Sequence, residues 1–507
     1  MRPTVYTSRP RDSYPARLLR ALLSAIIPGL GQLVAGVRRR AFFLIAIFAV
    51  VTIAAIVILS RGVDAIAGWV VQPKVLLALL WVDIIVMLIR LFAVIDAWLT
   101  AKTGAMKPAR QKGSRMLLTG LGLVVILVFT VAPHAVAGYY TIVSRNLLTN
   151  VFAPGSTSTT QKVTASSSGG GNSGTTTASQ GQDTTTSLGT GPTITGGSDS
   201  RITILLIGLD SGYMRTGARS DSMNVATVDL KTGKVAMFGL PRNTTDVPIG
   251  PKTAAALANS SKVKTVNGKK VWTDLLNALY GTAVTHPSIA PDGGDPGAEA
   301  LRETASLMLG IPIDYYAEVN MLGLADMVDA VGGVTINLKT ALHITYAPLN
   351  PGEPKKYYVF NVGLNKLNGL QALAYARDRS DSDDYVRMGR QRCILMGMLY
   401  QNSVTSLTLH FGNIAKALED NVKTSIPVSA LPDLIKLRGK LDAGSMITEG
   451  FTPTNYLLSY DNGSNVLDTT KIHAAVKTIL NDPAQWIADH PPAAGSGGAS
   501  DCWKITK

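Results

Sequence analysis

The stretch Arg201–Leu240, RITILLIGLDSGYMRTGARSDSMNVATVDLKTGKVAMFGL, contains three short apolar segments separated by polar turns. These segments are residues 202–209, 223–230 and 234–240, and each holds at most one charged residue. Apolar runs of this length, bounded by turn residues, are typical of buried strands. The stretch therefore predicts three neighbouring strands in the interior of a globular domain.

Helical patterns follow these strands along the chain. Segments 298–309, 321–331 and 367–376 have the apolar spacing of helices, and a longer helix is expected to start near Asp384. A strand-like segment, 334–338, lies between the second and third of these helices. This order of strands and helices predicts a layered α/β domain.

Three apolar segments upstream have the composition of transmembrane helices. Segment 41–60 has twenty residues without a charge, enough to cross a hydrocarbon core of about 30 Å. Segments 76–99 and 116–139 are also predicted to span, although the former contains Asp83, Arg90 and Asp96. These charges either face a helix bundle, which would make them functional candidates, or lie near an interface because the span is tilted or displaced.

The positive charge of the chain is concentrated at its membrane end. Residues 1–199 carry 18 Lys and Arg against 6 Asp and Glu, whereas residues 200–507 carry 30 against 28. Basic residues alternate between the flanks of the three spans in a way that predicts a cytoplasmic N-terminus and an extracytoplasmic C-terminal domain. A basic segment next to a membrane is suited to anionic lipids. No basic surface with interleaved aromatic residues remains for nucleic acid.

The remaining segments complete the expected domain organisation. Residues 1–40 form a basic cytoplasmic or interfacial segment, since the apolar part of it contains Pro28 and three glycines. Residues 140–200 are a linker rich in Ser, Thr and Gly, which lacks the apolar content needed to fold. Residues 201–425 form the α/β domain, and residues 426–507 form a C-terminal extension without an assigned role.

Two cysteines occur in the chain, Cys393 and Cys502. They have neither the CxxC spacing nor the neighbouring histidines of a zinc site. They are either one disulfide of an extracytoplasmic domain or two buried thiols, and their spacing does not decide between these.

Two aspartates lie at the ends of predicted strands. Asp210 ends the first strand, and Asp221 precedes the second. Mg²⁺ prefers one or two carboxylates together with phosphate oxygens, so this pair suits a metal that binds with a phosphorylated ligand. Acidic residues at strand ends are more often simply solvated.

A dense charged segment, Tyr375–Arg392 (YARDRSDSDDYVRMGRQR), contains five arginines and four aspartates. Arg387, Arg390 and Gln391 have the spacing of one helix face near a helix N-terminus, where anions are favoured. Arg377 and Arg379 precede this helix, and Arg242 follows the third strand. Converging guanidinium groups suit a pyrophosphate, whereas a solvated surface of salt bridges is the alternative.

Three blocks of sequence together resemble the LytR-CpsA-Psr family of cell-wall glycopolymer transferases, over about residues 201–400. They are IGLDSGYMRTGARSDSMNVATVDLKTGKVAMFGLPRN, IDYYAEVNMLGLADMVDAVGGVTI and NGLQALAYARDRSDSDDYVRMGRQR. The resemblance implies an α/β/α sandwich with a central mixed sheet and an apolar tunnel for a lipid. It also implies a membrane-anchored enzyme that transfers a glycopolymer from a polyprenyl pyrophosphate to a hydroxyl of peptidoglycan.

The resemblance assigns roles to particular residues. Asp210 and Asp221 match the family's Mg²⁺ ligands, and the proposed catalytic set is Asp210, Asp221, Arg219, Arg377 and Asp384. The positions that match pyrophosphate-binding residues are Arg219, Arg242, Arg377, Arg379, Arg387 and Gln391, with Arg390 in the same motif. The family's usual Pro-Arg-Asp reads Pro241-Arg242-Asn243 here, so a charge that would orient Arg242 is absent.

The implied mechanism is electrostatic, with arginines and Mg²⁺ neutralising the pyrophosphate while a sugar hydroxyl attacks. Two other functions use the same residues. One is a polyprenyl-lipid binder that regulates envelope enzymes without catalysis. The other is a pyrophosphatase, in which water replaces the sugar hydroxyl.

Overall fold

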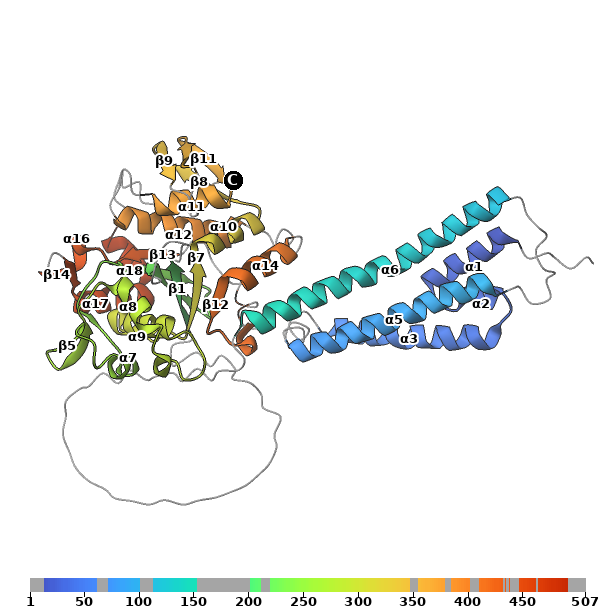
Figure 1. The fold of residues 1–507 in the computed structure, drawn as a ribbon, viewed down its shortest axis with the longest axis horizontal. Coiled ribbons are helices and arrows are strands. Elements are labelled where there is room, and N and C mark those ends of the chain that lie inside the picture. Colours follow the sequence, from blue (N-terminus) through green and yellow to red (C-terminus); the bar gives the residue numbers. More distant parts are fainter. Residues whose placement is uncertain are drawn as a thin grey trace, which may run out of the picture. The chain divides into compact units, whose positions relative to one another are not determined.

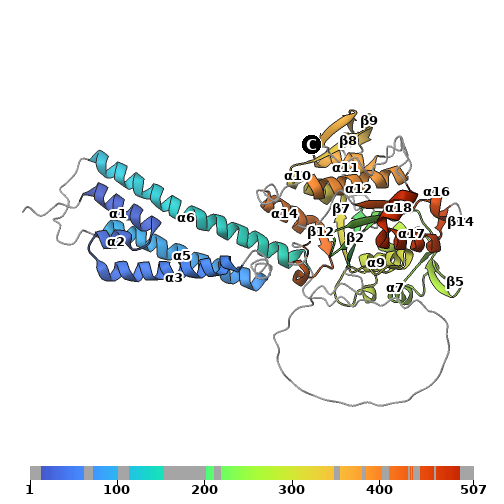
Figure 2. The same cartoon turned by 180° about the vertical axis from the view of Figure 1, so that it is seen from behind.

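The computed structural model describes residues 13–61, 72–100, 113–152, 201–210, 219–346, 354–378, 384–401, 410–431, 434, 437, 446–461 and 464–490. The chain divides into two compact units, Met1–Leu148 and Thr149–Lys507. Long helices make up the N-terminal unit, and the strands of the described residues belong to the C-terminal unit (Figures 1 and 2).

The N-terminal unit contains three helices that are long and apolar enough to cross a membrane. They confirm the three predicted spans and extend them. The apolar part of the last helix continues to residue 150, so the first residues of the predicted linker are helical. The helices of this unit are α1 (Tyr14–Ile26), α2 (Leu30–Val34), α3 (Arg38–Ser60), α5 (Pro73–Leu99) and α6 (Gly113–Asn150).

The apolar segment 21–37 does not form one continuous helix, as its glycines and proline predicted. Helix α1 ends before Pro28, and α2 starts after Gly29, whose φ is +104°. A Cβ atom on Gly29 would lie 2.6 Å from the carbonyl oxygen of Ala41, so this turn requires glycine.

The charged residues of the second span face other helices of the same unit. His134 Nδ1 in α6 lies 2.7 Å from Asp83 Oδ1 in α5. Arg90 Nη2 donates to the carbonyl oxygen of Ala25, in the last turn of α1, at 2.7 Å. Asp96 accepts hydrogen bonds from the side chains of Gln32 in α2 and Arg40 in α3, both at 3.1 Å. Of the two sequence interpretations, the structure therefore agrees with charges that face a bundle.

The central sheet of the C-terminal unit has six strands in the order β12-β7-β1-β2-β3-β13. The pairs β1–β7 and β3–β13 are parallel, and the other three neighbouring pairs are antiparallel. The sheet is therefore mixed, as expected. Its strands are β1 (Arg201–Leu209), β2 (Ser220–Asp229), β3 (Val235–Gly239), β7 (Tyr315–Asn320), β12 (Val422–Thr424) and β13 (Ile447–Gly450).

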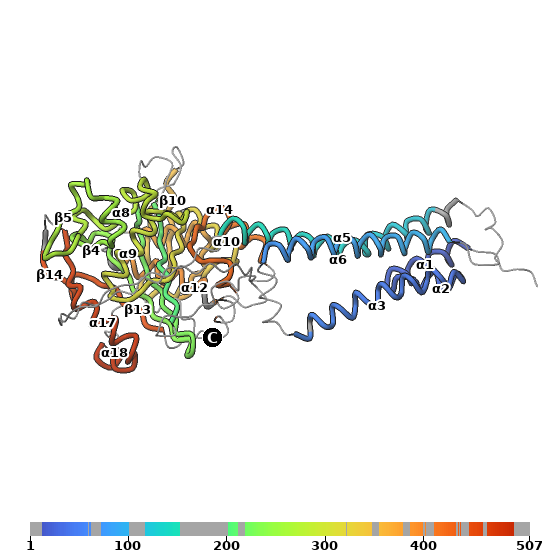
Figure 3. Tube along the Cα trace, turned by 90° about the horizontal axis from the view of Figure 1, so that it is seen from below, coloured from blue at the N-terminus to red at the C-terminus, as the bar shows by residue number. Residues whose placement is uncertain are grey.

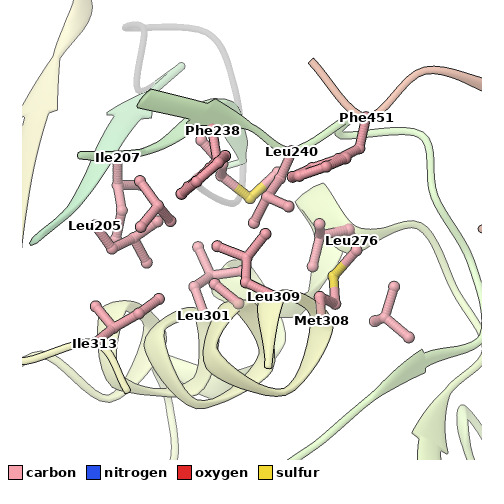
Figure 4. Packing of buried hydrophobic residues seen from close by; sticks show 14 of the residues in the cluster. Leu205, Ile207, Phe238, Leu240, Leu276, Leu301, Met308, Leu309, Ile313 and Phe451 are labelled. Carbon is pink, nitrogen blue, oxygen red and sulfur yellow. The ribbon is translucent and has the colours of Figure 1, made fainter. Parts of the chain in front are cut away.

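Helices cover both faces of this sheet and bury alternate residues of its strands. In Figure 4, Leu205, Ile207 and Phe238 lie against Leu301 and Leu309 of α9. The partly buried side chains of the intervening strand positions pack into a second cluster on the other face. The structure is thus the predicted α/β/α sandwich, seen along another direction in Figure 3. One face is covered by α8 (Leu276–Ala283), α9 (Pro296–Leu309) and α17 (Thr469–Asn481), and the other by α10 (Met321–Ala330), α11 (Gly369–Arg377) and α12 (Asp384–Gln401).

Short elements surround these layers. The small sheets are β8 (Val334–Leu338) with β11 (Gly363–Leu367), β9 (Leu342–Tyr346) with β10 (Lys356–Phe360), β14 (Leu457–Asp461) with β15 (Ser464–Leu467), and β4 (Val247–Pro248) with β6 (Lys269–Trp272) and β5 (Val263–Val266). The other helices are α7 (Pro251–Ala256), η1 (Pro287–Ile289), α14 (Phe411–Asn421), η2 (Val428–Ala430), α16 (Pro453–Tyr456) and α18 (Pro483–Asp489).

The boundary that the sequence analysis set at residue 425 does not separate two structural parts. Strand β13 pairs with β3 as the sixth strand of the central sheet. Ile472 and Val476 of α17 are fully buried in the main hydrophobic cluster. The described residues after 425 therefore complete the α/β core, which the sequence could not show because β13 is only four residues long.

A buried acidic cluster lies beneath the sheet, between β7 and the helices α8 and α9. The hydroxyl oxygen of Tyr280 lies 3.1 Å from both Glu318 Oε2 and Asp295 Oδ2, although it has one proton to donate. Lys423 Nζ is 3.6 Å from Glu318 Oε1, but the Lys423 side chain is 74% exposed. Burial, and then the neighbouring charge of Asp295, raise the pKa of Glu318 to about 7.

This shift predicts a pH-dependent stability. The folded protein keeps the Glu318 proton up to about pH 7, whereas the unfolded chain loses it near 4.5. The stability that this proton provides is therefore complete below pH 4.5, and it is lost as the pH rises through about 7. Relative to the native protein, Glu318→Gln should gain unfolding free energy between pH 5 and pH 8, by at most about 1.4 kcal/mol per pH unit.

Thermal unfolding of the full chain in nanodiscs at pH 5, 6.5 and 8 measures this difference. Asp292→Asn serves as the control, because it alters an exposed carboxylate on the loop that contains Asp295. A Glu318→Gln difference that is constant with pH would contradict the prediction.

Candidate active site

A cavity of about 470 Å³ lies between the central sheet and the layer formed by α10, α11 and α12. One part of its lining is apolar and the other carries the charged side chains that the sequence singled out. Large apolar residues come from the strand β1, the helices α10 to α14 and the strands β7 and β12: Leu206, Val319, Leu324, Met327, Leu373, Leu395, Leu418 and Val422. The polar lining includes Asp210, Asp221, Asn224, Arg242, Asn320, Arg377, Arg387 and Gln391.

The antiparallel pairing of β1 and β2 brings the two predicted aspartates to one end of the cavity. The amide of Asp210 donates to the carbonyl oxygen of Arg219 at 2.9 Å, two residues before Asp221. The register shifts between Gly208 and Leu209. A Cβ atom on Gly208 would lie 2.9 Å from the Cβ of Ser222, so glycine permits this close approach of the strands.

Asp221 is contacted by two arginines from different elements. Arg242 Nη1 lies 2.5 Å from Asp221 Oδ1, and both side chains are mostly buried. Arg387 Nη2, in the first turn of α12, donates to the carbonyl oxygen of Asp221 at 3.1 Å. The Asp221 carboxylate thus orients Arg242, which is the function that the absent aspartate at position 243 would have served. It retains acceptor sites on its other oxygen.

Three further polar groups of the cavity are buried without a hydrogen-bond partner among the described residues. They are Nη1 of Arg377, at the end of α11, Oε1 of Gln391, one turn after Arg387, and Oδ1 of Asn224 on β2. The Arg377 guanidinium also lies 5.7 Å from the centre of the Tyr346 ring. An unpaired buried donor is costly, so the Arg377 atom indicates a place where an anionic ligand group would bind.

Arg390 has a different environment from the arginines that line the cavity. Its Nη1 lies 2.6 Å from Asp378 Oδ2, and both side chains are almost completely buried. Its guanidinium also lies 5.5 Å from the centre of the Tyr375 ring. Arg390 therefore joins the end of α11 to α12 and does not line the cavity, contrary to its predicted role in binding pyrophosphate.

Comparisons with known proteins agree with this architecture. The model of the LytR_cpsA_psr family matches residues 159–477, which is more than half of the chain. This protein belongs to the LytR_cpsA_psr family. The resemblance inferred from the three sequence blocks is therefore confirmed.

Two curated relatives illustrate the similarity. Biofilm regulatory protein A of Streptococcus mutans is 32% identical over 246 residues, which cover 47% of this chain and 53% of the relative. Polyisoprenyl-teichoic acid--peptidoglycan teichoic acid transferase TagU of Bacillus subtilis is 29% identical over 233 residues, which cover 46% of this chain and 62% of the relative. The chain thus spans between about half and three fifths of the length of these relatives.

Solved structures are also similar. Protein gbs0355 of Streptococcus agalactiae is 28% identical, with a TM-score of 0.42, and the match covers 56% of this chain and 89% of that one. B. subtilis TagV is 24% identical, with a TM-score of 0.40, and the match covers 56% and 98%.

The structure places most of the family's motif residues together. Asp210, Asp221, Arg242, Arg377, Arg387 and Gln391 line one cavity. Arg219 is exposed and does not contribute to the lining. Arg379 lies outside the described residues, and Asp384 is described only as the first residue of α12. Cys393 is fully buried and disulfide-bonded, which agrees with the first of the two alternatives, while Cys502, the other cysteine of the chain, lies outside the described residues.

Five contributors to the site were missed by the sequence analysis. Asp378 was counted in the charged segment but not recognised as the partner of Arg390, because the pair joins two helices across a turn. The other four are polar residues that line the cavity: Ser222, Asn224, Glu318 and Asn320. Alternation along the strand does not mark Asn224, because β2 buries residues 223, 224 and 225 in succession.

The donor set is compatible with the Mg²⁺ that the resemblance implies. Asp210 and Asp221 line the same end of the cavity, and two carboxylates with phosphate oxygens are ligands that this ion prefers. Within the described part of the chain, no cluster of three or more His, Cys, Asp or Glu side chains could hold a metal by itself.

The buried pair Asp378–Arg390 generates a prediction about stability. Asp378→Ala leaves a guanidinium buried without its carboxylate, and should lower the free energy of unfolding by about 3 to 5 kcal/mol. The double substitution Asp378→Leu with Arg390→Met should recover most of this loss because it removes both charges.

Denaturant unfolding of the full chain measures both effects. Asp420→Ala is the matched control, because it breaks an ion pair of similar length on the surface, with Lys416, and should leave the unfolding free energy nearly unchanged. Equal losses for the single and double variants would contradict the account of the buried pair.

Proposed function

We propose that this protein is a phosphotransferase of the cell envelope that attaches a glycopolymer to peptidoglycan. The donor is a glycopolymer linked to a polyprenyl pyrophosphate, the bond formed is a phosphodiester, and the product released is polyprenyl phosphate. The proposal includes dependence on Mg²⁺.

The observation that carries the proposal is the division of a single cavity into an apolar part and an anion-binding part. Three arginines line the polar part, and Arg377 Nη1 is buried there without a partner among the residues that the structure describes. Guanidinium groups bind phosphate oxygens bidentately, so this end suits a pyrophosphate. The apolar side chains along the rest of the cavity suit the part of the lipid that adjoins the pyrophosphate.

The names of relatives support the class of reaction. TagU of B. subtilis is named as a transferase of teichoic acid from a polyisoprenyl carrier to peptidoglycan. This chain belongs to the LytR_cpsA_psr family and has residues that match the family's motifs. We therefore propose the same general reaction for it.

The proposed mechanism depends on positioning and charge neutralisation. The sugar hydroxyl of peptidoglycan attacks the phosphorus that carries the glycan, and a new P–O bond forms. The bond from this phosphorus to the bridging oxygen breaks, so polyprenyl phosphate leaves with that oxygen. Arg377, Arg387 and Arg242 stabilise the negative charge that accumulates on the phosphate oxygens and on the leaving group.

Asp210 and Asp221 would hold the Mg²⁺, which supplies further neutralisation of the pyrophosphate when it is bound. The proton of the attacking hydroxyl must pass to a base. We assign this role to one of three aspartates of the motifs: Asp210, Asp221 or Asp384. No nucleophilic side chain is required, because the acceptor hydroxyl attacks phosphorus directly.

We also propose a topology for the chain. The three apolar helices anchor it in the cell membrane with the N-terminus in the cytoplasm and the α/β unit outside. The distribution of Lys and Arg between the flanks supports this orientation.

The reaction can be tested with the full chain in nanodiscs, Mg²⁺, a short synthetic polyprenyl-pyrophosphoryl glycan and peptidoglycan fragments. Arg377→Ala should lower kcat/KM by about 10- to 100-fold, because it removes a charge-assisted contact to the pyrophosphate. Asp221→Ala should lower it by at least as much, since it also releases Arg242. Mass spectrometry of the coupled product measures both.

Lys269→Ala, a change of one exposed cation on β6, is the control and should leave the rate unchanged. Free phosphorylated glycan in place of coupled product would identify a pyrophosphatase. Tight lipid binding without either product would identify a non-catalytic binder, and both outcomes would contradict the proposal.

A further inference from the structure

The segment between α10 and α11 forms an outer layer on the C-terminal unit. Strands β9 and β10 form one antiparallel pair, and β8 and β11, which flank them in the chain, form a second. The inner faces of these two strand pairs are buried in the same hydrophobic cluster as α11 and α12. Their outer faces are not covered by another described element, and in Figure 1 they lie at one end of the unit.

The outer faces of the two strand pairs, with the turn between β10 and β11, expose four large apolar side chains close together in the chain. Tyr357 is 75% exposed, Val359 60%, Val362 65% and Leu364 62%. Isolated exposed hydrophobic residues are ordinary, but these four fall within eight consecutive residues. Tyr357 and Val359 have the same strand parity, and so point to the same side of β10.

The described residues of this surface carry charge of one sign. Residues 334–346 and 354–367 contain four lysines and one histidine but no aspartate or glutamate, while Glu353 lies outside the described residues. The lysines Lys339, Lys355, Lys356 and Lys366 are all exposed, but Lys356 has the strand parity of the buried Phe360. We call the exposed apolar residues together with Lys339, Lys355 and Lys366 the outer hairpin face.

We propose that the outer hairpin face docks the C-terminal unit onto the surface of a membrane that contains anionic lipids. A tyrosine and aliphatic side chains flanked by lysines are the combination that binds a bilayer interface, because the apolar groups enter the headgroup region while the ammonium groups remain near lipid phosphates. Each lysine near an anionic surface strengthens binding about fivefold. The three apolar helices of the same chain would keep a bilayer within reach of this face.

The outer hairpin face is connected to the cavity through two helices. The strands β8 to β11 join α10 to α11, and both helices contribute residues to the cavity wall: Leu324 and Met327 from α10, and Leu373 and Arg377 from α11. A bilayer at the outer hairpin face would therefore contact the segment that supports one wall of the cavity. The docking itself does not depend on which reaction the cavity performs.

The hairpin formed by β5 and β6 provides an internal comparison. It also exposes lysines, including Lys264, Lys269 and Lys270, but Val266 is the one large hydrophobic side chain that is exposed on its described residues. In Figure 1, β5 lies at the opposite end of the unit from β9. A general attraction of basic side chains to lipid would act on both hairpins, whereas the proposed docking uses only the outer hairpin face.

The experiment uses the full chain with a specific protease site inserted in the linker, near residue 175, and reconstituted in vesicles. The vesicles contain either phosphatidylcholine alone or phosphatidylcholine with 30 mol% phosphatidylglycerol. After cleavage, flotation measures what fraction of the released C-terminal fragment remains on the vesicles. The fragment should remain on the anionic vesicles and leave the neutral ones, and salt should weaken the binding.

Two variants test the face itself. Lys339→Glu with Lys355→Glu and Lys366→Glu should lower the partition onto anionic vesicles by at least about 100-fold. The matched control, Lys264→Glu with Lys269→Glu and Lys270→Glu, makes the same change of charge and should retain binding. Val359→Ser with Leu364→Ser should also release the fragment although the charge is unchanged. The thermal unfolding of each variant shows whether it is folded.

Three results would overturn the proposal. One is complete release of the native fragment from anionic vesicles. Another is equal release by the two triple variants, which would indicate attraction by net charge alone. The third is retention on both kinds of vesicle regardless of the substitutions, which would indicate binding to the membrane helices.

Discussion

Asp221 is the residue at which the elements of the site are joined. Its strand pairs with β1, its carboxylate binds Arg242 from the turn after β3, and its carbonyl oxygen binds Arg387 from α12. Gly208 makes this geometry possible, because a side chain there would collide with Ser222 on the neighbouring strand. The sheet, the turn and the outer helical layer are thus fixed relative to one another by contacts to one residue.

The arginines in and beside this site have two different roles, one structural and one in binding an anion. Arg390 and Asp378 neutralise each other inside the helical layer, and hold α11 and α12 together where both helices approach the cavity. Arg377, the last residue of α11, has a buried donor, Nη1, without a partner among the described residues. A buried charged pair costs little once its partners are in place, whereas an unpaired donor gains most from a ligand. This contrast distinguishes the structural arginine from those that can bind an anion.

Much of the architecture was predictable from the sequence because its apolar segments are long. The three spans and the strands of residues 201–240 follow from continuous apolar runs, and α12 begins at Asp384 as expected. The role of residues after 425 was not predictable, since β13 has four residues and joins the sheet through a parallel contact that is distant in sequence. The six cavity residues were predictable from the family motifs together, but not from spacing alone. The sequence could not show that Arg387 lines the cavity while Arg390 does not. Helical spacing indicates which face of the helix a residue is on, but not which residue of another helix it contacts.

The central claim is that the apolar part of the cavity holds the lipid of a polyprenyl pyrophosphate whose phosphates lie among the arginines. The most direct test is photocrosslinking of the full chain with a polyprenyl pyrophosphate that carries a photoreactive group in its first isoprene unit. The account predicts that mass spectrometry will find the label on α10 and α11, at Leu324, Met327 or Leu373, and that unlabelled lipid will compete for it. Labelling confined to the three N-terminal helices, with none on the cavity wall, would contradict it.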